Sequence, residues 1–312
     1  MSGCRVSIVV PVYNEEASLR ELHRRLTLVL TGVEESYEVV LVDDGSTDAS
    51  FRTILELRQA DPRVRGVRLL RNFGHQVAVA AGLDFATGQC AITLDADLQH
   101  PPELIPDLLK RWAEGYEVVT TRRDDGADVG LFKRWTSRAF YRVMSGLGDV
   151  ALDPGSADFR LLDARVVETL RGFRERGRFL RGLVAWLGFR ETSLPYRADP
   201  RFAGSTKYSV RAMVGLAIDG ITSFSSFPLH LSTYLGFAVS LASFAYAGYA
   251  VYAHLFTDRT VEGWTSVMVA VLFLAGVQLI SLGIIGAYLA RVFQELKGRP
   301  LYLVRETIGI DA

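Results

Sequence analysis

Two long stretches without a charged side chain most constrain how this 312-residue chain can fold. One runs from Gly220 to Thr257 and the other from Gly263 to Ala290. Each is longer than the roughly 20 apolar residues that an α-helix needs to cross a bilayer. Because only the short segment TDRTVE joins them, we expect a hairpin of two membrane-spanning helices whose flanks lie on the same side. The alternative is a pair of buried helices in a soluble protein.

Basic residues flank this hairpin on both sides, whereas the loop between the two stretches carries only Arg259. Under the positive-inside rule such flanks lie in the cytoplasm. We therefore expect the rest of the chain and its C-terminal tail to be cytoplasmic. The flanking basic residues are Arg197, Arg201, Lys207 and Arg211 before the hairpin, and Arg291, Lys297, Arg299 and Arg305 after it.

The segment Lys207–Phe224 has apolar residues at steps of three and four, which places them on one helical face. Next to a membrane hairpin, we expect this amphipathic helix to lie at the membrane surface. A helix that caps the soluble part of the chain is the alternative.

The first half of the chain alternates between apolar β-branched runs and helix-like segments. This alternation predicts an α/β fold with a mostly parallel sheet that helices cover on both faces. The carboxyl ends of such strands share one edge, and ligands bind there. The expected strands are Val6–Val12, Glu38–Val42, Val64–Leu70, Cys90–Leu94 and Glu117–Thr121, and the expected helices are Glu15–Thr31, Thr47–Ala60, His75–Thr87 and Pro102–Glu114.

Composition narrows the class of protein further. Lysine plus arginine equal aspartate plus glutamate at 35 each, so the net charge is zero, which argues against a general nucleic-acid binder. Two cysteines make neither a disulfide framework nor a metal cluster. The N-terminal apolar run is short and is interrupted by Pro11, so we expect no signal peptide.

Polar residues gather in the loops after the expected strands. These loops read PVYNEE, DDGSTD, DADLQH and TTRRDD, and they begin at residues 11, 43, 95 and 120. Four polar loops at one sheet edge predict a binding site.

The loop DADLQH carries two carboxylates one residue apart, Asp95 and Asp97. Both can reach one cation if the chain turns there, and oxygen ligands suit Mg²⁺ or Mn²⁺. Gln99 adds a neutral oxygen. Because Mg²⁺ usually takes only one or two carboxylates and completes its shell with phosphates, the pair implies a diphosphate ligand. In the alternative, Asp97 only caps a short turn before Pro101.

The motifs PVYNEE, VLVDDGSTD, RNFGHQ, ITLDADLQHPPE and RFAGSTKYS, in this order, resemble glycosyltransferase family 2 with its GT-A, Rossmann-like fold. More narrowly they are similar to the polyprenyl-phosphate glycosyltransferases, which include dolichol-phosphate mannose synthases and bacterial undecaprenyl-phosphate sugar transferases. The ending GIIGAYLARVFQELKGRPLYLV resembles the bacterial branch. The resemblance spans nearly the whole chain.

The resemblance implies which residues hold the sugar nucleotide and the metal. Asp43 and Asp44 match acids that read the base and ribose, with Asp44 preferred, although either acid, or Ser46, can instead cap the next helix. Arg201 and Lys207 match a basic pair that closes over the diphosphate, but GSTK lacks the glutamate that many relatives have there. The nucleotide-sugar positions are Pro11, Tyr13, Glu15, Asp43, Asp44, Asp95, Arg123, Arg201 and Lys207, and the metal positions are Asp95, Asp97 and Gln99.

The resemblance also implies an acceptor side. Asp158 matches the position of a catalytic base in the bacterial branch, and Asp97 is assigned to catalysis with it. A phosphate monoester is already largely ionised at neutral pH, since its second pKa is about 6. Positioning and charge neutralisation can therefore matter more than proton removal. Lys133, Arg134, Ser137 and Arg138 lie on an expected helix and would bind a lipid phosphate, unless they only solvate that helix or meet anionic head groups.

The implied function is inverting, metal-dependent transfer of a hexose from a nucleotide-diphosphate sugar to a membrane polyprenyl phosphate. UDP-glucose is the expected donor, with GDP-mannose, UDP-GlcNAc and a modified arabinose as alternatives. The expected location is the bacterial inner membrane, with several spans and a cytoplasmic catalytic domain, in a homo-oligomer such as a tetramer. The expected cofactor is Mg²⁺ or Mn²⁺.

The expected domains are a GT-A catalytic domain at 1–204, interfacial helices at 205–228, a transmembrane hairpin at 229–291 and a cytoplasmic tail at 292–312. A processive polysaccharide synthase is a rival, but LLKRW and LFKRW have leucine where the Q-x-x-R-W signature has glutamine. A non-catalytic membrane scaffold that binds sugar nucleotides is the second rival.

Overall fold

A computed structural model describes residues 5–33, 36–123, 156–173, 175, 180–196, 227–256 and 263–310. The chain divides into two compact units. The first comprises Met1–Ala217 with Arg299–Ala312, and the second is Ile218–Gly298.

The first unit is built on one sheet with the strand order β7-β5-β6-β4-β1-β2-β3-β8. The four central strands β4, β1, β2 and β3 are mutually parallel, which confirms the prediction of a mostly parallel sheet. Every residue of β1 and β2 is buried, as expected for strands covered on both faces. The strands are β1 Val6–Val12, β2 Tyr37–Asp43, β3 Val64–Leu69, β4 Cys90–Thr93, β5 Val118–Arg123, β6 Ser156–Asp163, β7 Glu191–Tyr196 and β8 Val304–Ile308.

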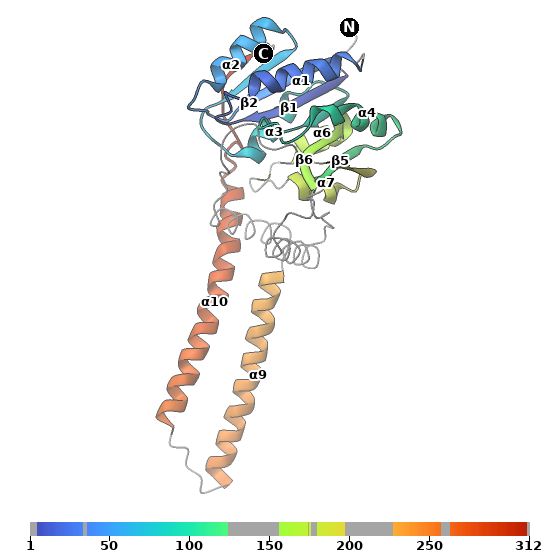
Figure 1. Ribbon diagram of the computed structural model, residues 1–312. Coiled ribbons are helices and arrows are strands. Elements are labelled where there is room, and N and C mark those ends of the chain that lie inside the picture. Colours follow the sequence, from blue (N-terminus) through green and yellow to red (C-terminus); the bar gives the residue numbers. More distant parts are fainter. Residues whose placement is uncertain are drawn as a thin grey trace. The chain divides into compact units, whose positions relative to one another are not determined.

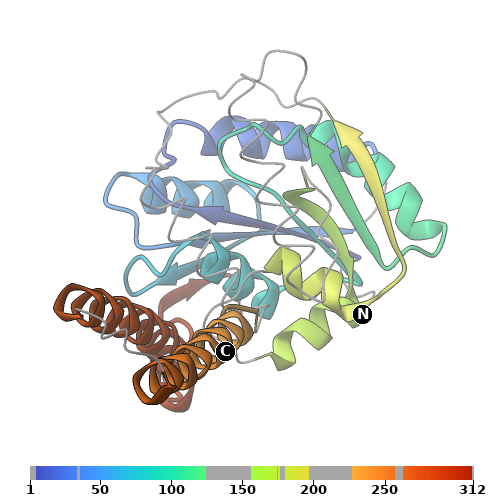
Figure 2. The same ribbon diagram turned by 90° about the horizontal axis from the view of Figure 1, so that it is seen from below.

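Helices cover both faces of this sheet (Figures 1 and 2). One layer holds α1, α2 and α4, which contact one another through α1, and the other holds α3, α6 and α7, which contact one another through α6. All four helices expected in the first half are present, although α1 and α2 begin later than expected because polar turns occupy the residues before them. The bounds are α1 Leu19–Thr31, α2 Ser50–Ala60, α3 His75–Phe85, the 3₁₀ turn η1 Pro102–Leu104, α4 Ile105–Ala113, α6 Ala164–Gly172 and α7 Leu180–Leu187.

Helix α3 packs against β1 and β2 at very short range because of a glycine. A Cβ atom on Gly82 would lie 2.3 Å from Cγ1 of Val9 and 3.0 Å from Cγ2 of Val42. No larger residue fits at Gly82 without displacing the sheet. This close approach fixes α3, and with it His75 at the start of the helix, relative to the carboxyl edge of the sheet.

Strands β6 and β8 run antiparallel to their neighbours. Thr93 at the end of β4 pairs with Arg160 in the middle of β6, so the first residues of β6, residues 156–159, extend beyond the end of β4. Asp158, in the sequence ADFRLLD, therefore lies at the carboxyl edge of the parallel strands, as does the acidic loop after β4. Strand β8 comes from the C-terminal tail, for which no strand was predicted, and it pairs with β3 to form the edge of the sheet.

The second unit consists of α9, Phe227–Phe256, and α10, Trp264–Leu296, which contact each other. Large apolar side chains such as Phe237, Phe244 and Leu279 are exposed along both helices. Among the residues that the structure describes, one helix, Val269–Leu296, is long and apolar enough to cross a membrane, with a mean hydropathy of 2.3. The amphipathic helix expected over 207–224 lies outside the described residues.

Candidate active site

The carboxyl edge of the parallel strands brings the first two polar loops together. The backbone N–H of Asn14 donates to Oγ of Ser46 at 3.0 Å, and the N–H of Thr47 donates to Oδ1 of Asn14 at 2.8 Å. Asn14 adopts a positive φ of 55°, which asparagine tolerates better than most residues. The loops after β1 and β2 therefore form one polar-lined rim.

Asp43 is the last residue of β2 and Asp44 follows it, and both are buried. Oδ1 of Asp43 accepts from the N–H of Ser46 at 3.0 Å, and Oδ2 lies 3.3 Å from Nε of Arg68, an ion pair without hydrogen-bond geometry. Neither acid is the N-cap of α2, because that position belongs to Ala49. The capping alternative for Asp43 and Asp44 is therefore wrong.

Asp44 holds the loop that leads into α3. Its oxygens accept from the N–H groups of Phe73 at 2.7 Å and Gly74 at 2.9 Å. Burial raises the pKa of Asp44, and these two backbone hydrogen bonds oppose the shift. The carboxylate thus joins the end of β2 to the RNFGHQ segment.

Three further residues expected at the nucleotide lie at the end of β1 and in the loop after it. Pro11 is a buried residue of β1, opposite Val42, whereas Tyr13 is 37% exposed just beyond the strand. The N–H of Glu15 donates to Oγ of Ser50 at 2.8 Å. Tyr13 is thus the residue of this loop that offers an aromatic face to solvent.

The acidic loop after β4 turns sharply, as a shared cation site requires. Leu98 adopts a positive φ of 62°, and the N–H of Gln99 donates to Oδ1 of Asp97 at 3.1 Å. The turn contact that was the alternative role for Asp97 is therefore present. The side chain of Asp95 is 33% exposed.

The side-chain oxygens of the acidic loop suit a divalent ion that takes one or two carboxylates and completes its coordination shell with a diphosphate and water. The described residues contain no group of three or more histidine, cysteine, aspartate or glutamate side chains placed to hold a metal. Asp95 and Asp97 would thus supply the protein carboxylates, and the substrate would supply the remaining charge.

His100 holds the acidic loop in its conformation through a backbone hydrogen bond and two ring contacts. Its Nδ1 accepts from the N–H of Asp95 at 3.1 Å, which leaves the proton on Nε2. The ring stacks on Phe159 with the ring centres 5.5 Å apart and meets Tyr196 edge-on at 6.0 Å. His100 belongs to the loop DADLQH, but the sequence alone gave it no role, because its aromatic partners lie on β6 and β7.

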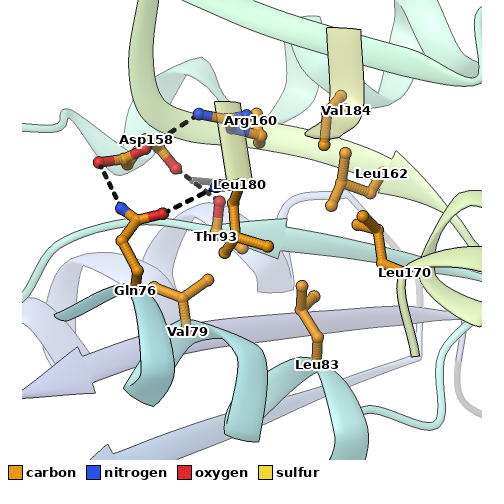
Figure 3. Close-up of a pocket in the computed structure, with 10 residues that line it drawn as sticks. All are labelled: Gln76, Val79, Leu83, Thr93, Asp158, Arg160, Leu162, Leu170, Leu180 and Val184. Atoms are coloured by element: carbon orange, nitrogen blue, oxygen red, sulfur yellow. Dashed lines mark hydrogen bonds and ion pairs between the residues drawn. The ribbon is translucent and has the colours of Figure 1, made fainter. Parts of the chain in front are cut away.

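Asp158 lies at the centre of an ion-pair cluster, and Figure 3 shows its contacts with Arg160 and Gln76. Arg160 Nη2 donates to Oδ1 at 2.9 Å, and Arg181 donates to Oδ1 through Nε and to Oδ2 through Nη2, both at 2.8 Å. Gln76 Nε2 lies 3.4 Å from Oδ2. Burial alone would raise the pKa of Asp158, but hydrogen bonds from Arg181 and His75 hold it well below the usual range.

His75 lies between the acidic loop and Asp158. Its Nε2 is 3.5 Å from Oδ1 of Asp95 and 3.6 Å from Oδ2 of Asp158. Burial would lower the pKa of His75, but the two carboxylates more than offset it and raise the pKa to about 8. At neutral pH this imidazole is therefore largely a cation.

The remaining expected site residues are placed only in part or lie outside the described residues. Arg123 is the last residue of β5, opposite Tyr196, and only its backbone is described. Arg201 and Lys207 of the expected basic pair and the acceptor residues Lys133, Arg134, Ser137 and Arg138 lie outside the described residues.

Sequence reasoning missed four residues of the Asp158 cluster: His75, Gln76, Arg160 and Arg181. The first two belong to the RNFGHQ motif, which carried the family resemblance without residue roles. Arg160 follows Asp158 by two residues and so lies on the same face of β6. Arg181 gave no sequence signal, because only the fold brings α7 to the start of β6.

Comparison with known proteins identifies the family. The model of glycosyl transferase family 2 matches residues 7–171, and that of the GtrB C-terminal hairpin matches residues 227–292. The uncharacterized glycosyltransferase YkcC of Bacillus subtilis is 44% identical over 305 residues, covering 98% of this chain and 94% of that protein. The bactoprenol glucosyl transferase of Shigella phage SfII is 36% identical over 303 residues, covering 97% of this chain and 98% of that protein.

Among solved structures, glucosyl-3-phosphoglycerate synthase of Mycobacterium tuberculosis, in complex with Mn²⁺ and UDP-glucose, aligns with a TM-score of 0.44 at 19% identity. The alignment covers 71% of this chain and 78% of that one. The family match spans more than half of the chain, and the relatives match nearly all of it. This chain belongs to glycosyltransferase family 2.

Proposed function

We propose that this protein transfers glucose from UDP-glucose to a polyprenyl phosphate such as undecaprenyl phosphate, with inversion at the anomeric carbon. The observation that carries the proposal is the full-length similarity to bactoprenol glucosyl transferases, at 36% identity over 97% of the chain. The match to the GtrB C-terminal hairpin extends this similarity beyond the nucleotide-sugar domain.

The acids at the carboxyl edge support the donor half of this proposal. Asp44, with Asp43 behind it, would hold the ribose or base, and Tyr13 would stack on the base. Asp95 and Asp97, with Gln99, would hold Mg²⁺ or Mn²⁺. When bound, the ion would supply positive charge to the departing diphosphate.

The reaction needs one bond made and one bond broken. A phosphate oxygen of the acceptor attacks the anomeric carbon, and the bond from that carbon to the diphosphate oxygen breaks, so that UDP leaves with the bonding electrons. Because the acceptor phosphate has a second pKa of about 6, it is already largely ionised and needs no base. Both oxygens of Asp158 accept hydrogen bonds from arginines. We therefore assign Asp158 to holding these cations, in place of the proton removal that the resemblance implied.

The long helices of the second unit support a membrane location. Helix α9 and all but the last four residues of α10 fall within the matched hairpin, and exposed apolar side chains line both helices. We propose that both helices cross the bilayer, that helices at 205–228 lie at its surface, and that the catalytic domain is cytoplasmic. A homo-oligomer such as a tetramer stays a prediction.

A transfer assay tests the proposed function. Purified protein in detergent would receive undecaprenyl phosphate, Mn²⁺ and UDP-glucose labelled in the sugar, and organic extraction would separate lipid from nucleotide. Label in the organic phase that requires Mn²⁺ and the lipid phosphate supports the proposal. Label retained by protein alone would show a sugar-nucleotide scaffold. GDP-mannose, UDP-GlcNAc and a modified-arabinose donor in parallel reactions would show which sugar is transferred.

A second experiment tests the membrane hairpin. Truncation after Pro200 would also remove β8, which is part of the catalytic sheet. A better variant replaces residues 227–296 with a flexible glycine-serine linker and keeps the tail. We expect it to bind UDP normally but to transfer poorly to long-chain acceptor in vesicles, and full transfer would contradict a role for the hairpin.

A further inference from the structure

Asn14 has an unusual backbone conformation at the candidate active site, directly after Tyr13. Its φ of 55° lies in the left-handed region, which residues other than glycine rarely adopt. Asparagine enters this region more easily than most residues, because its short polar side chain can form local hydrogen bonds. Such a conformation persists where the surrounding structure holds it, and it is often found at ligand sites.

Asn14 binds the loop after β2 through both its backbone and its side chain. Its N–H donates to Oγ of Ser46 at 3.0 Å, and its Oδ1 accepts from the N–H of Thr47 at 2.8 Å. The hydroxyl of Thr47 is a further donor to Oδ1 at 3.3 Å. Because Asn14 both donates to and accepts from neighbouring residues of the other loop, its position along that loop is fixed.

Tyr13 lies between two residues that are tied to the loop after β2. On one side, the carbonyl of Val12 accepts from the N–H of Asp44 at 2.8 Å. On the other side lies Asn14, with its bonds to residues 46 and 47. Since the backbone is held at both neighbours, the direction in which the side chain of Tyr13 leaves the chain is fixed.

Other hydrogen bonds between the two loops lie further from the strands, close to the start of α2. They anchor the outer parts of the loops, whereas Asn14 sets their spacing next to Tyr13 and Asp44. In these outer bonds the N–H of Glu15 donates to Oγ of Ser50 at 2.8 Å, the N–H of Glu16 to Oδ2 of Asp48 at 3.3 Å, and the N–H of Ala49 to Oε2 of Glu16 at 2.8 Å.

The loop after β2 is also confined on its other side, by the segment after β3. Gly45 has a φ of 70°, and a Cβ atom there would lie 2.6 Å from the carbonyl carbon of Arg71 and 2.7 Å from the backbone nitrogen of Asn72. The loop therefore packs directly on this backbone. Asn14 closes the opposite side, so that Asp44 is held between two fixed segments.

We propose that Asn14 is a positioning residue for the nucleoside part of the donor, because it sets the distance between the loop that carries Tyr13 and the loop that carries Asp44. This inference rests on the proposed function, in which these two residues bind the base and the ribose. The hydrogen bonds of Asn14 all go to the loop after β2, whereas the diphosphate would be bound at the acidic loop after β4. Loss of Asn14 should therefore weaken the binding of the nucleoside and leave the binding of the diphosphate unchanged.

Three variants of Asn14 separate its side-chain acceptor from its backbone conformation. Asn14→Ala removes Oδ1 and disfavours the positive φ, Asn14→Gly permits the positive φ without Oδ1, and Asn14→Asp retains both features. UDP would be titrated against each variant by calorimetry in the presence of Mn²⁺. We expect affinity to fall roughly 10-fold for Asn14→Ala and roughly threefold for Asn14→Gly, and to stay within about twofold for Asn14→Asp. The control Gln59→Ala, which removes an exposed amide from α2, should bind UDP normally.

Two further measurements separate positioning from general destabilisation. Pyrophosphate with Mn²⁺ lacks the nucleoside, so its affinity should be the same for Asn14→Ala and the unaltered protein, which would also show that the variant is folded. Ser46→Ala removes the acceptor for the N–H of Asn14. Because both substitutions break one link, Asn14→Ala combined with Ser46→Ala should lose no more UDP affinity than Asn14→Ala alone.

The outcomes distinguish this inference from the proposed function. Weaker UDP binding by Asn14→Ala, with rescue by Asn14→Asp and unchanged pyrophosphate binding, supports the inference even if no lipid phosphate is glycosylated. Normal transfer by Asn14→Ala with an unchanged KM for UDP-glucose would overturn the inference and leave the proposed function intact. Equal losses of UDP and pyrophosphate affinity, or losses that multiply in the double variant, would also overturn it.

Discussion

Arg181 and Asp158 form a two-point ion pair, in which Nε and Nη2 of the arginine each lie 2.8 Å from a different carboxylate oxygen. The pair ties the start of α7 to the start of β6 at the carboxyl edge of the sheet. An aspartate bound in this way, with Arg160 as a further partner, is a weak proton acceptor. Its geometry therefore favours a role in holding charge over a role as a base.

Asp158→Asn should destabilise the protein because it leaves the buried Arg160 without its counter-charge. Breaking a buried ion pair from one side costs about 3–5 kcal/mol of unfolding free energy. Urea unfolding in detergent, followed by tryptophan fluorescence, measures this loss, and Asp107→Asn on the exposed face of α4 is the control. Unaltered stability, together with the loss of an acidic limb from the pH–rate profile, would instead identify Asp158 as a base.

The raised pKa of Asp44 leads to a prediction of how the affinity for UDP depends on pH. Burial raises its pKa above the ordinary carboxyl value of 3.8. The ionised form accepts hydrogen bonds, so affinity is present above the folded-state pKa and is lost as the pH falls through it. We expect calorimetric UDP affinity to fall on mild acidification, at a higher pH than an ordinary carboxylate would cause.

Asp44→Asn provides the matched variant for this pH dependence. It should weaken UDP binding roughly 10- to 100-fold and remove most of the pH dependence, because a charged acceptor is replaced by a neutral amide. Asp107→Asn should change neither property. An Asp44→Asn protein that keeps the same pH dependence would show that another group titrates.

His100→Phe should keep the aromatic packing against Phe159 but remove the acceptor for the N–H of Asp95. An unsatisfied buried donor costs about 1–3 kcal/mol. We expect the Mn²⁺ concentration for half-maximal activity to rise several-fold as the acidic loop loses its fixed conformation. His100→Gln restores an acceptor oxygen and should recover part of the loss; an unchanged Mn²⁺ requirement in His100→Phe would refute this role.

Deletion of residues 303–312 should lower the affinity for UDP indirectly, through strand β3. The carbonyl of Leu303 accepts from the N–H of Leu70, and Glu306 pairs with Arg68, whose Nε lies near Asp43. Without β8, strand β3, which leads to the segment that binds Asp44, loses these contacts. We expect the loss to lower the free energy of unfolding by about 1–3 kcal/mol. Thermal unfolding with and without UDP measures the effect, and deletion of residues 311–312 alone is the control. Unchanged UDP affinity in the longer deletion would show that β8 has no part in the site.

Local sequence patterns were sufficient for the central sheet and for the acidic loop. Local composition is enough to predict the buried strands β1 and β2 and the helix α3 with its small residues. The acidic residues follow strands that can be recognised from the sequence alone. Strand β8 was missed because VRETI is short, has two adjacent charged residues in place of an apolar–polar alternation, and is mostly exposed, which resembles an ordinary tail. The partners of Asp158 and His100 were missed because these contacts join segments that are far apart in the chain.

Transfer of labelled glucose from UDP-glucose to undecaprenyl phosphate by the purified full chain, with Asp97→Asn in parallel, tests the proposed reaction and its metal site together. We expect Mn²⁺-dependent label in the organic phase for the unaltered protein, and at least a roughly tenfold lower rate for Asp97→Asn, since a metal carboxylate is lost. Transfer by Asp97→Asn at the full rate and the same Mn²⁺ requirement would contradict the metal site. Absence of labelled lipid with every donor sugar would contradict the proposed function.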